Sequence, residues 1–146
     1  ALDIPVLGLD TLEVEAFPYA EAGLPVCPLL EAGRGEVVWS LYEGNQDGWR
    51  QRGEVRIGSL EDVFADVPDR ILLCGEAVHR LGGELRQMLR GDSIVIDQLP
   101  PTRRNSTLGM LGYLRLTSGE RDDIAALQPF YMRSPSISLP KSSPPS

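Results

Sequence analysis

Residues 30–43 constrain the fold of this chain most strongly, because they predict two antiparallel strands joined by a tight turn. Gly33 and Gly35 permit positive backbone φ angles on either side of an exposed Arg34, which suits a hairpin turn. Alternating apolar and polar positions after the turn predict a half-buried second strand. Its side chains divide between two faces, one formed by Val37, Trp39 and Leu41 and the other by Val38, Ser40 and Tyr42.

Further strands and helices are expected to follow the hairpin. A third strand covers residues 49–57, and Ser59 then occupies the N-cap of a helix, with Asp62 in place of the usual Glu of a capping box. Strands at residues 70–74 and 93–96 flank a helix with one apolar face. A strand, a helix and a strand in succession imply parallel pairing with a right-handed crossover. The apolar face of that helix is formed by Val78, Leu81, Leu85, Met88 and Leu89.

The last long helix of the chain is rich in apolar residues. It opens at Thr102 or Asn105, and Gly119 is well placed to end it. A further turn of helix, capped by Asp122 or Asp123, comes next. The side chains expected to face inward from the long helix are Leu108, Met110, Leu111 and Leu114.

Four segments resemble a known family in their order and spacing. They are ALDIPVLGLDTLE at the start, EAGRGE at residues 31–36, GERDD at residues 119–123 and PFYMR at residues 129–133. Together they resemble the C-terminal half of the TsaB (YeaZ) family, which is often called glycoprotease-like. Glu31, Phe130 and Met132 depart from the commoner residues of that pattern, but each change is conservative.

The resemblance implies an α/β fold, namely one lobe of an actin-like (ribonuclease H-like) ATPase fold. The expected mixed sheet has three antiparallel and then two parallel strands, with helices on both faces. The sequence pattern by itself predicts a mixed α/β sheet with helices on both faces.

The resemblance also divides the chain into three parts. Residues 1–22 connect to an N-terminal lobe that this chain would lack, residues 23–133 form the C-terminal lobe, and residues 134–146 form a flexible tail. Within the first part, Thr11 is expected to cap a short helix that Pro18 stops.

The charge of the chain argues against direct binding to nucleic acid. The sequence has 14 basic and 21 acidic residues, a net charge of -7, and a single lysine, Lys141. A surface that binds tRNA must neutralise several phosphates with Lys or Arg, so we expect tRNA contact only through partners. No apolar run approaches the roughly 20 residues of a membrane helix, and the composition is that of a cytoplasmic globular domain.

Few residues point to catalysis. His79 is the only histidine, and it lies off the apolar stripe of its helix. Cys27 and Cys74 are expected to be buried free thiols, because they are far apart and lack the spacing of a zinc site. Glu31, Glu36 and Glu76 could form an acid and base pair, although surface carboxylates are the commoner outcome. We therefore assign no catalytic residue, no metal ligand and no cofactor.

The candidate site is the hairpin turn, formed by Gly33, Arg34, Gly35 and Glu36. In actin-like lobes such a turn can approach a nucleotide phosphate with its backbone N–H groups. Alternatively, the Arg34 guanidinium pairs with a carboxylate of a partner protein. Both interpretations remain open from the sequence.

The resemblance implies a non-enzymatic role in tRNA processing. TsaB-like proteins are scaffolds in the complex that makes threonylcarbamoyladenosine at position 37 of tRNA, where they stabilise and organise a catalytic TsaD-like subunit beside an accessory TsaE-like ATPase. A homodimer through exposed sheet edges is left open. The two alternatives are a glycoprotease-like hydrolase and a degenerate nucleotide-binding module.

Overall fold

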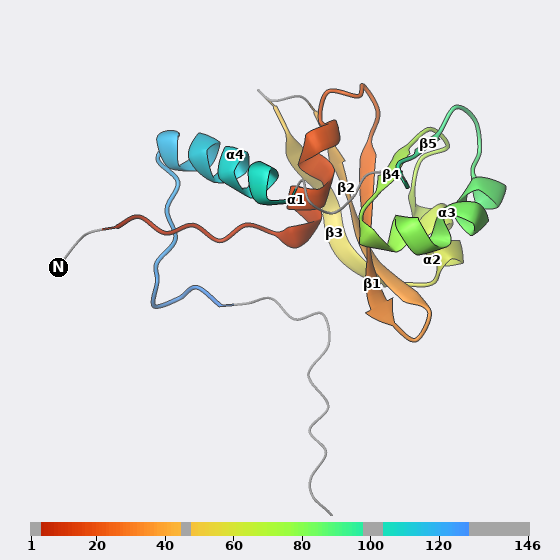
Figure 1. The fold of residues 1–146 in the computed structure, drawn as a ribbon, viewed down its shortest axis with the longest axis horizontal. Coiled ribbons are helices and arrows are strands. Elements are labelled where there is room, and N and C mark those ends of the chain that lie inside the picture. Colours follow the sequence, from red (N-terminus) through yellow and green to blue (C-terminus); the bar gives the residue numbers. More distant parts are fainter. Residues whose placement is uncertain (1–3, 45–47, 98–103, 129–146) are drawn as a thin grey trace, which may run out of the picture.

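Five strands form one mixed sheet in the computed structural model, which describes residues 4–44, 48–97 and 104–128 (Figure 1). The strand order is β3-β2-β1-β4-β5. The first three strands pair antiparallel, whereas β4 and β5 are parallel to β1. This arrangement confirms the predicted fold class. The strands are β1 (Val26–Gly33), β2 (Glu36–Glu43), β3 (Arg50–Gly58), β4 (Leu72–Cys74) and β5 (Ile94–Val95).

The β1–β2 hairpin lies at the centre of the sheet. Trp39 is opposite Leu29 in the antiparallel register, and Leu72 of β4 is opposite Val26 in the parallel register. The side chains of β2 alternate between the two faces of the sheet, as predicted. The expectation that only one of these faces is buried is wrong. Ser40 and Tyr42 are as buried as Trp39, because helices cover both faces of the sheet.

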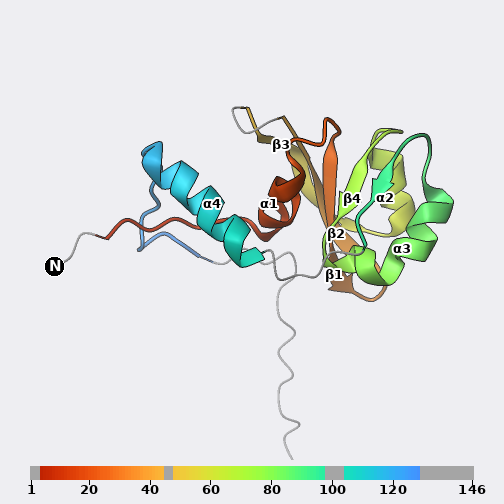
Figure 2. The same ribbon diagram turned by 45° about the horizontal axis from the view of Figure 1, so that its top comes forward.

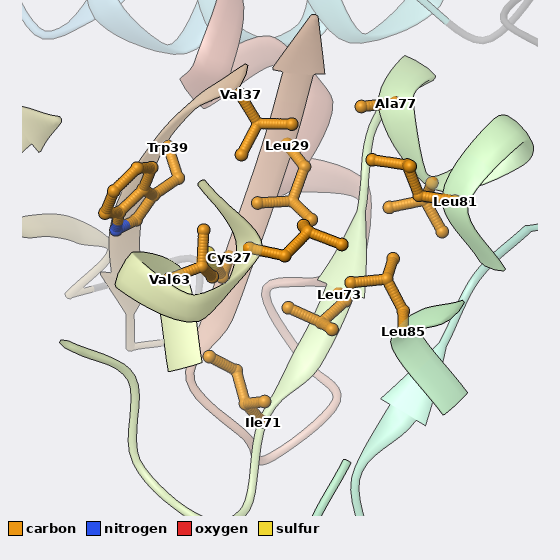
Figure 3. Packing of buried hydrophobic residues seen from close by; sticks show 12 residues of the cluster. Cys27, Leu29, Val37, Trp39, Val63, Ile71, Leu73, Ala77, Leu81 and Leu85 are labelled. Atoms are coloured by element: carbon orange, nitrogen blue, oxygen red, sulfur yellow. The ribbon is translucent and has the colours of Figure 1, made fainter. Parts of the chain in front are cut away.

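Two helices, α2 (Leu60–Asp66) and α3 (Glu76–Met88), cover one face of the sheet. Figure 3 shows the core beneath them, where the helix side chains meet apolar side chains from the strands. The helices contribute Val63 and Leu85, both fully buried. The core side chains from the strands include Cys27, Leu29, Val37, Trp39 and Leu73.

The opposite face of the sheet is covered by α1 (Thr11–Ala16), which is followed by a short 3-10 helix, η1 (Phe17–Tyr19). Figures 1 and 2 show α1 on the side of the sheet away from α2 and α3. Its side chains form a second core cluster with those of the strands. This cluster includes Leu12, Ala16, Leu24, Val26, Val38, Tyr42 and Leu72.

Side-chain caps fix the starts of α1 and α2. The expected capping box of α2 is confirmed, because Asp62 N–H donates to Ser59 Oγ at 3.3 Å while Ser59 N–H donates to Asp62 Oδ2 at 2.9 Å. For α1 the expected cap is wrong by one residue. Asp10 Oδ1 accepts a hydrogen bond from Leu12 N–H at 2.8 Å, so Thr11 is the first helical residue.

The α-helix ends at Ala16, two residues before Pro18, as expected. Pro18 lies within η1, at a position near the start of a helical turn, where proline is tolerated because no intrahelical N–H donor is required. The chain therefore continues from α1 into η1 before it turns towards β1.

The last helix, α4 (Arg104–Thr117), lies on the outer side of α1, away from the sheet (Figure 2). The expected inward face is wrong for three of its four residues, because Leu108, Met110 and Leu114 are 43%, 55% and 40% exposed. Leu111 is buried, together with Thr107 one turn earlier. The reason is that α4 packs on the narrow α1 and not on the broad sheet, so a single stripe is covered.

The end of α4 follows the prediction, because Gly119 has a φ of +93° and follows the last helical turn. The cap expected at Asp122 or Asp123 is found at Asp123, whose Oδ1 accepts a hydrogen bond from Ala125 N–H at 3.0 Å. Residues 124–126 form a single turn, which Leu127 N–H closes by donating to Asp123 O at 2.9 Å. The PFYMR segment and the predicted tail at residues 134–146 lie outside the described residues.

Candidate functional site

The hairpin turn places three consecutive residues in the left-handed region. Gly33, Arg34 and Gly35 have φ angles of +78°, +56° and +77°. The positive φ angles at both glycines were expected. That of Arg34 was not, since non-glycine residues seldom adopt this conformation. The turn exposes the Arg34 side chain at the tip of the β1–β2 hairpin.

The part of β1 next to the turn is tied to α3. Arg80 Nε donates to Glu31 Oε1 at 2.6 Å, joining the end of β1 to the exposed side of α3. Both side chains are about half exposed, so the pair contributes at most about 1 kcal/mol to stability. The pair matters mainly for position, because it holds the Glu31 carboxylate against α3 while Arg34 stays exposed at the tip of the hairpin. Glu36 lies opposite Gly33 at the start of β2.

A hollow of about 270 Å³ lies between the start of α1 and the sheet. Its acidic lining residues are Asp10, Glu31 and Glu76, and Asp10 also caps α1. Three carboxyl groups make this hollow unfavourable for an anionic phosphate. The hollow therefore lends no support to nucleotide binding beside the hairpin. Its other lining residues are Leu9, Thr11, Leu12, Leu30, Val38 and Val55.

A larger hollow of about 460 Å³ lies along the edge strand β3 and the end of α2. Four of its five charged side chains form ion pairs with one another. Arg52 contacts Glu43 at 2.8 Å, and Arg56 contacts Asp66 at 2.9 Å. Trp39 Nε1 donates a further hydrogen bond to Asp66 at 3.1 Å. These contacts position Asp66 against the core and offset the charges of the hollow.

The two cysteines are free and buried, as expected. Burial raises the pKa of both the Cys27 and Cys74 thiols, so the thiols are protonated at neutral pH. A protonated thiol inside a core is a poor nucleophile. His79 lies on the exposed side of α3, off its apolar stripe, as the sequence indicates. No group of three His, Cys, Asp or Glu side chains in the described residues could hold a metal ion.

An aromatic cluster at the end of α1 was missed by the sequence analysis. Tyr42 stacks on Trp49 with ring centroids 5.6 Å apart, and Phe17 meets Trp49 edge to face at 5.9 Å. Within the described part of the chain, Tyr42 Oη and Trp49 Nε1 are buried without a hydrogen-bond partner. Burial raises the pKa of Tyr42, which keeps its hydroxyl protonated. Strand alternation gives no signal for such a contact between a strand and the loop residue that follows it.

Comparison with known proteins identifies the fold. Neither a family model nor a curated protein matches the chain. A crystal structure from Pseudomonas aeruginosa, described as an uncharacterized protein with similarity to peptidase YeaZ, matches with a TM-score of 0.65 and 21% identity. YeaZ from Pseudomonas aeruginosa matches with a TM-score of 0.62 and 23% identity. The chain has a YeaZ-like fold.

The YeaZ-like fold extends over most of this chain but over only part of its neighbours. Each match covers 88% of this chain and 59% of the solved structure. The shared part contains the mixed sheet of three antiparallel and two parallel strands that the sequence resemblance implied.

Exposed apolar side chains of this YeaZ-like lobe gather on and beside α4. We define the α4 surface as α4 together with the two segments beside it, residues 4–9 and 120–127. Hydrogen bonds from Asp122 N–H to Val6 O (2.8 Å) and from Gly8 N–H to Asp122 Oδ2 (2.7 Å) join these segments. No helix among the described residues has the length and hydropathy needed to span a membrane. The exposed apolar residues of the α4 surface are Ile4, Leu108, Met110, Tyr113, Leu114, Ile124 and Leu127.

Proposed function

We propose that this chain is the C-terminal lobe of a TsaB-like scaffold subunit that acts in the cytoplasm and has no covalent step of its own. In this role it stabilises and organises a catalytic TsaD-like subunit, beside a TsaE-like ATPase, in the complex that makes threonylcarbamoyladenosine in tRNA. The observation that carries the proposal is the YeaZ-like fold over 88% of the chain, together with the motif resemblance.

The chemistry of the hairpin supports a contact with a protein partner. Arg34 is exposed at the tip of a turn, where a planar guanidinium can bind a carboxylate with two hydrogen bonds. The net charge of -7 makes the chain a poor direct ligand for tRNA, so the nucleic acid is contacted through the partners.

A peptidase is the second candidate, favoured by one observation. One structural neighbour is described as similar to peptidase YeaZ. A hydrolase of this kind needs an accessible nucleophile beside a base. The two thiols of this chain are buried and protonated, and its histidine is on the exposed side of α3. These observations favour the scaffold.

A chimera tests the proposal. This chain replaces the part of Pseudomonas aeruginosa YeaZ that it matches. The chimera is mixed with TsaD-like and TsaE-like proteins, ATP, a donor of the threonylcarbamoyl group and tRNA. Mass spectrometry of the tRNA nucleosides measures threonylcarbamoyladenosine. We expect the chimera to restore the modification, and Arg34→Glu to reduce it more than the control Arg90→Glu, whose side chain is also exposed.

The same samples separate the two candidates. A chimera that shows the circular dichroism of a folded α/β protein but restores no modification would contradict the scaffold role. Cleavage of a glycoprotein substrate by the chimera, and not by a mock purification, would support the peptidase instead.

A further inference from the structure

Two hollows adjoin along one side of the edge strand β3. The first, of about 460 Å³, is the hollow at the end of α2 described above, and the second, of about 520 Å³, lies between β3 and α2. Arg56 and Asp66 line both hollows, so their ion pair lies where the two meet. We define the β3–α2 groove as these two hollows. Its apolar lining residues include Pro25, Trp39, Leu41, Ile57, Ala65, Val67 and Pro68.

A β-bulge in β3 places the Glu54 side chain in this groove. In the register of β2 and β3, a single residue, Ser40, is opposite three residues, 53–55. Gly53 begins the bulge with a φ of +90°. Bulges are frequent at sheet edges and next to active sites, where they redirect a side chain. Here the redirected Glu54 lines the first hollow.

Two polar side chains fix the bulge. Ser40 is buried, and its hydroxyl donates to Glu54 O at 3.4 Å. Gln51 Nε2 donates to Ser40 Oγ at 2.9 Å and to Gly53 O at 3.2 Å. Two carbonyl groups of the bulge therefore have partners within the chain, which holds the backbone of Glu54 beside the groove.

The charges of the groove leave two carboxylates without a cation. Each arginine of β3 is already paired, with Glu43 or with Asp66. In the described part of the chain, Glu54 in the first hollow and Asp62 in the second have no ion pair. Hydrogen bonds from Ser59 go to Oδ2 of Asp62 and lower its pKa, so this carboxyl group is charged at neutral pH. Each hollow therefore presents one unpaired negative charge.

We propose that the β3–α2 groove binds a segment of a partner protein that carries two basic side chains, one on each side of the Arg56–Asp66 pair. A Lys or Arg side chain in each hollow pairs its charge with Glu54 or Asp62 and lays its aliphatic stem on the apolar lining. The net charge of -7 favours the approach of a basic partner. The proposal does not depend on the role in tRNA modification.

The apolar lining favours a protein segment over a small polyamine. Leu41 and Val67 are half-buried in the first hollow, and Ile57 is half-buried in the second. Residues between the two basic side chains of a protein segment can cover these apolar side chains. A polyamine supplies the charges but has no side chain to cover them.

NMR titration of the isotope-labelled chain tests the proposal. The probes are acetylated and amidated peptides in which one, two or three valines separate two arginines, and matched peptides carry glutamate in place of arginine. We expect an arginine peptide to shift the β3 and α2 amide signals saturably, and the glutamate peptides to shift none. Glu54→Gln should weaken binding at least about threefold, whereas the control Glu61→Gln, exposed on α2 outside the groove, should not. Arginine peptides that shift no β3 or α2 signal, or that bind Glu54→Gln as tightly as the unchanged chain, would overturn the proposal.

Two further measurements test the occupant and the bulge. Spermidine should bind the groove more weakly than the best arginine peptide, and equal or tighter binding would assign the groove to a polyamine instead. Gln51→Ala keeps both carboxylates but removes two hydrogen bonds that fix the bulge, so it should also weaken peptide binding. An unchanged affinity would contradict the role of the bulge in placing Glu54.

Discussion

The helices α3 and α4 have nearly equal lengths, 13 and 14 residues, but opposite relations to the rest of the molecule. One side of α3 is buried against the sheet, and its other side carries His79, Arg80 and Glu84 in solvent. The covered stripe of α4 is narrow, and its exposed side is apolar. The comparison teaches that α3 has the polar outer side expected of a helix at a protein surface. In contrast, α4 has the apolar outer side of a buried helix, and no described residue covers that side.

The junction before α3 shows how tightly this helix is built into the lobe. Gly75 precedes it with a φ of +100°, and a Cβ atom there would lie 2.5 Å from Leu29 O of β1. Buried α3 side chains then meet Leu73 of β4 in the core (Figure 3). No comparable constraint acts on Gly109 and Gly112 of α4, which have open space around them.

The largest expected effect comes from truncating a core side chain of α3. Leu85→Ala should lower the free energy of unfolding by about 2–5 kcal/mol, because Leu85 is fully buried. Leu108→Ala in α4 should cost less than about 1 kcal/mol, because that side chain is 43% exposed. Urea denaturation of both variants measures the difference. Equal decreases in the free energy of unfolding would contradict the contrast drawn between α3 and α4.

The ion pair beneath α4 should give the next largest effect. Arg115→Met leaves the Glu13 carboxyl group mostly buried and unpaired, which should cost about 2 kcal/mol and release α4 from α1. The matched control is Arg80→Met, whose partner Glu31 is 44% exposed, with an expected cost below about 1 kcal/mol. Thermal unfolding and amide exchange of α4 are measured for both variants. Similar decreases in stability would contradict the role of the Arg115–Glu13 pair in attaching α4 to α1.

The capping box of α2 gives a smaller effect that depends on pH. Ser59→Ala should cost about 1 kcal/mol at neutral pH. Backbone and side-chain hydrogen bonds from Ser59 lower the pKa of Asp62, so the folded state favours the carboxylate. The resulting stabilisation is present above the ordinary carboxyl pKa and is lost as pH falls through the lower folded value. NMR titration should show a higher Asp62 pKa in Ser59→Ala than in the unchanged chain. An equal pKa in the two proteins would be evidence against the capping box.

The smallest expected effect is a gain in stability. Gly109→Ala should stabilise the isolated chain by about 0.5–1 kcal/mol, because alanine favours the helix and finds open space. In α3, Gly82→Ala should gain less, since its Cβ would lie 2.8 Å from Asp97 Oδ2 and 3.3 Å from an Arg86 nitrogen. Thermal denaturation measures the stability of both variants. A lower stability of Gly109→Ala would show that α4 is already closely packed.

Local sequence signals predict α3 well and α4 poorly, for a physical reason. The apolar stripe of α3 selects one face, and that face meets the sheet. In α4 the apolar residues surround the helix, so periodicity selects no face. Its orientation is set by the contact between Arg115 and Glu13, which are 102 residues apart in sequence. No local pattern contains that information.

In the candidate site, too, the sequence predicts the local features and misses the contacts between residues far apart in the chain. The glycines of the hairpin turn were predicted, because a positive φ is a local requirement. The contact between Glu31 and Arg80 was not, because it joins residues 49 positions apart. The cap of α1 was predicted one residue too late, at Thr11, because Asp10 and Thr11 are adjacent and both are good N-cap residues.

The solvent accessibility of Tyr113 tests most directly whether this chain is one domain of a larger body. Hydroxyl-radical footprinting is applied to the chain alone and to its fusion with the unmatched part of YeaZ, with the buried Trp39 and the exposed His79 as internal references. We expect Tyr113 to be modified readily in the chain alone and at least fivefold more slowly in the fusion. Equal modification rates in a fusion whose two parts are both folded would contradict the account.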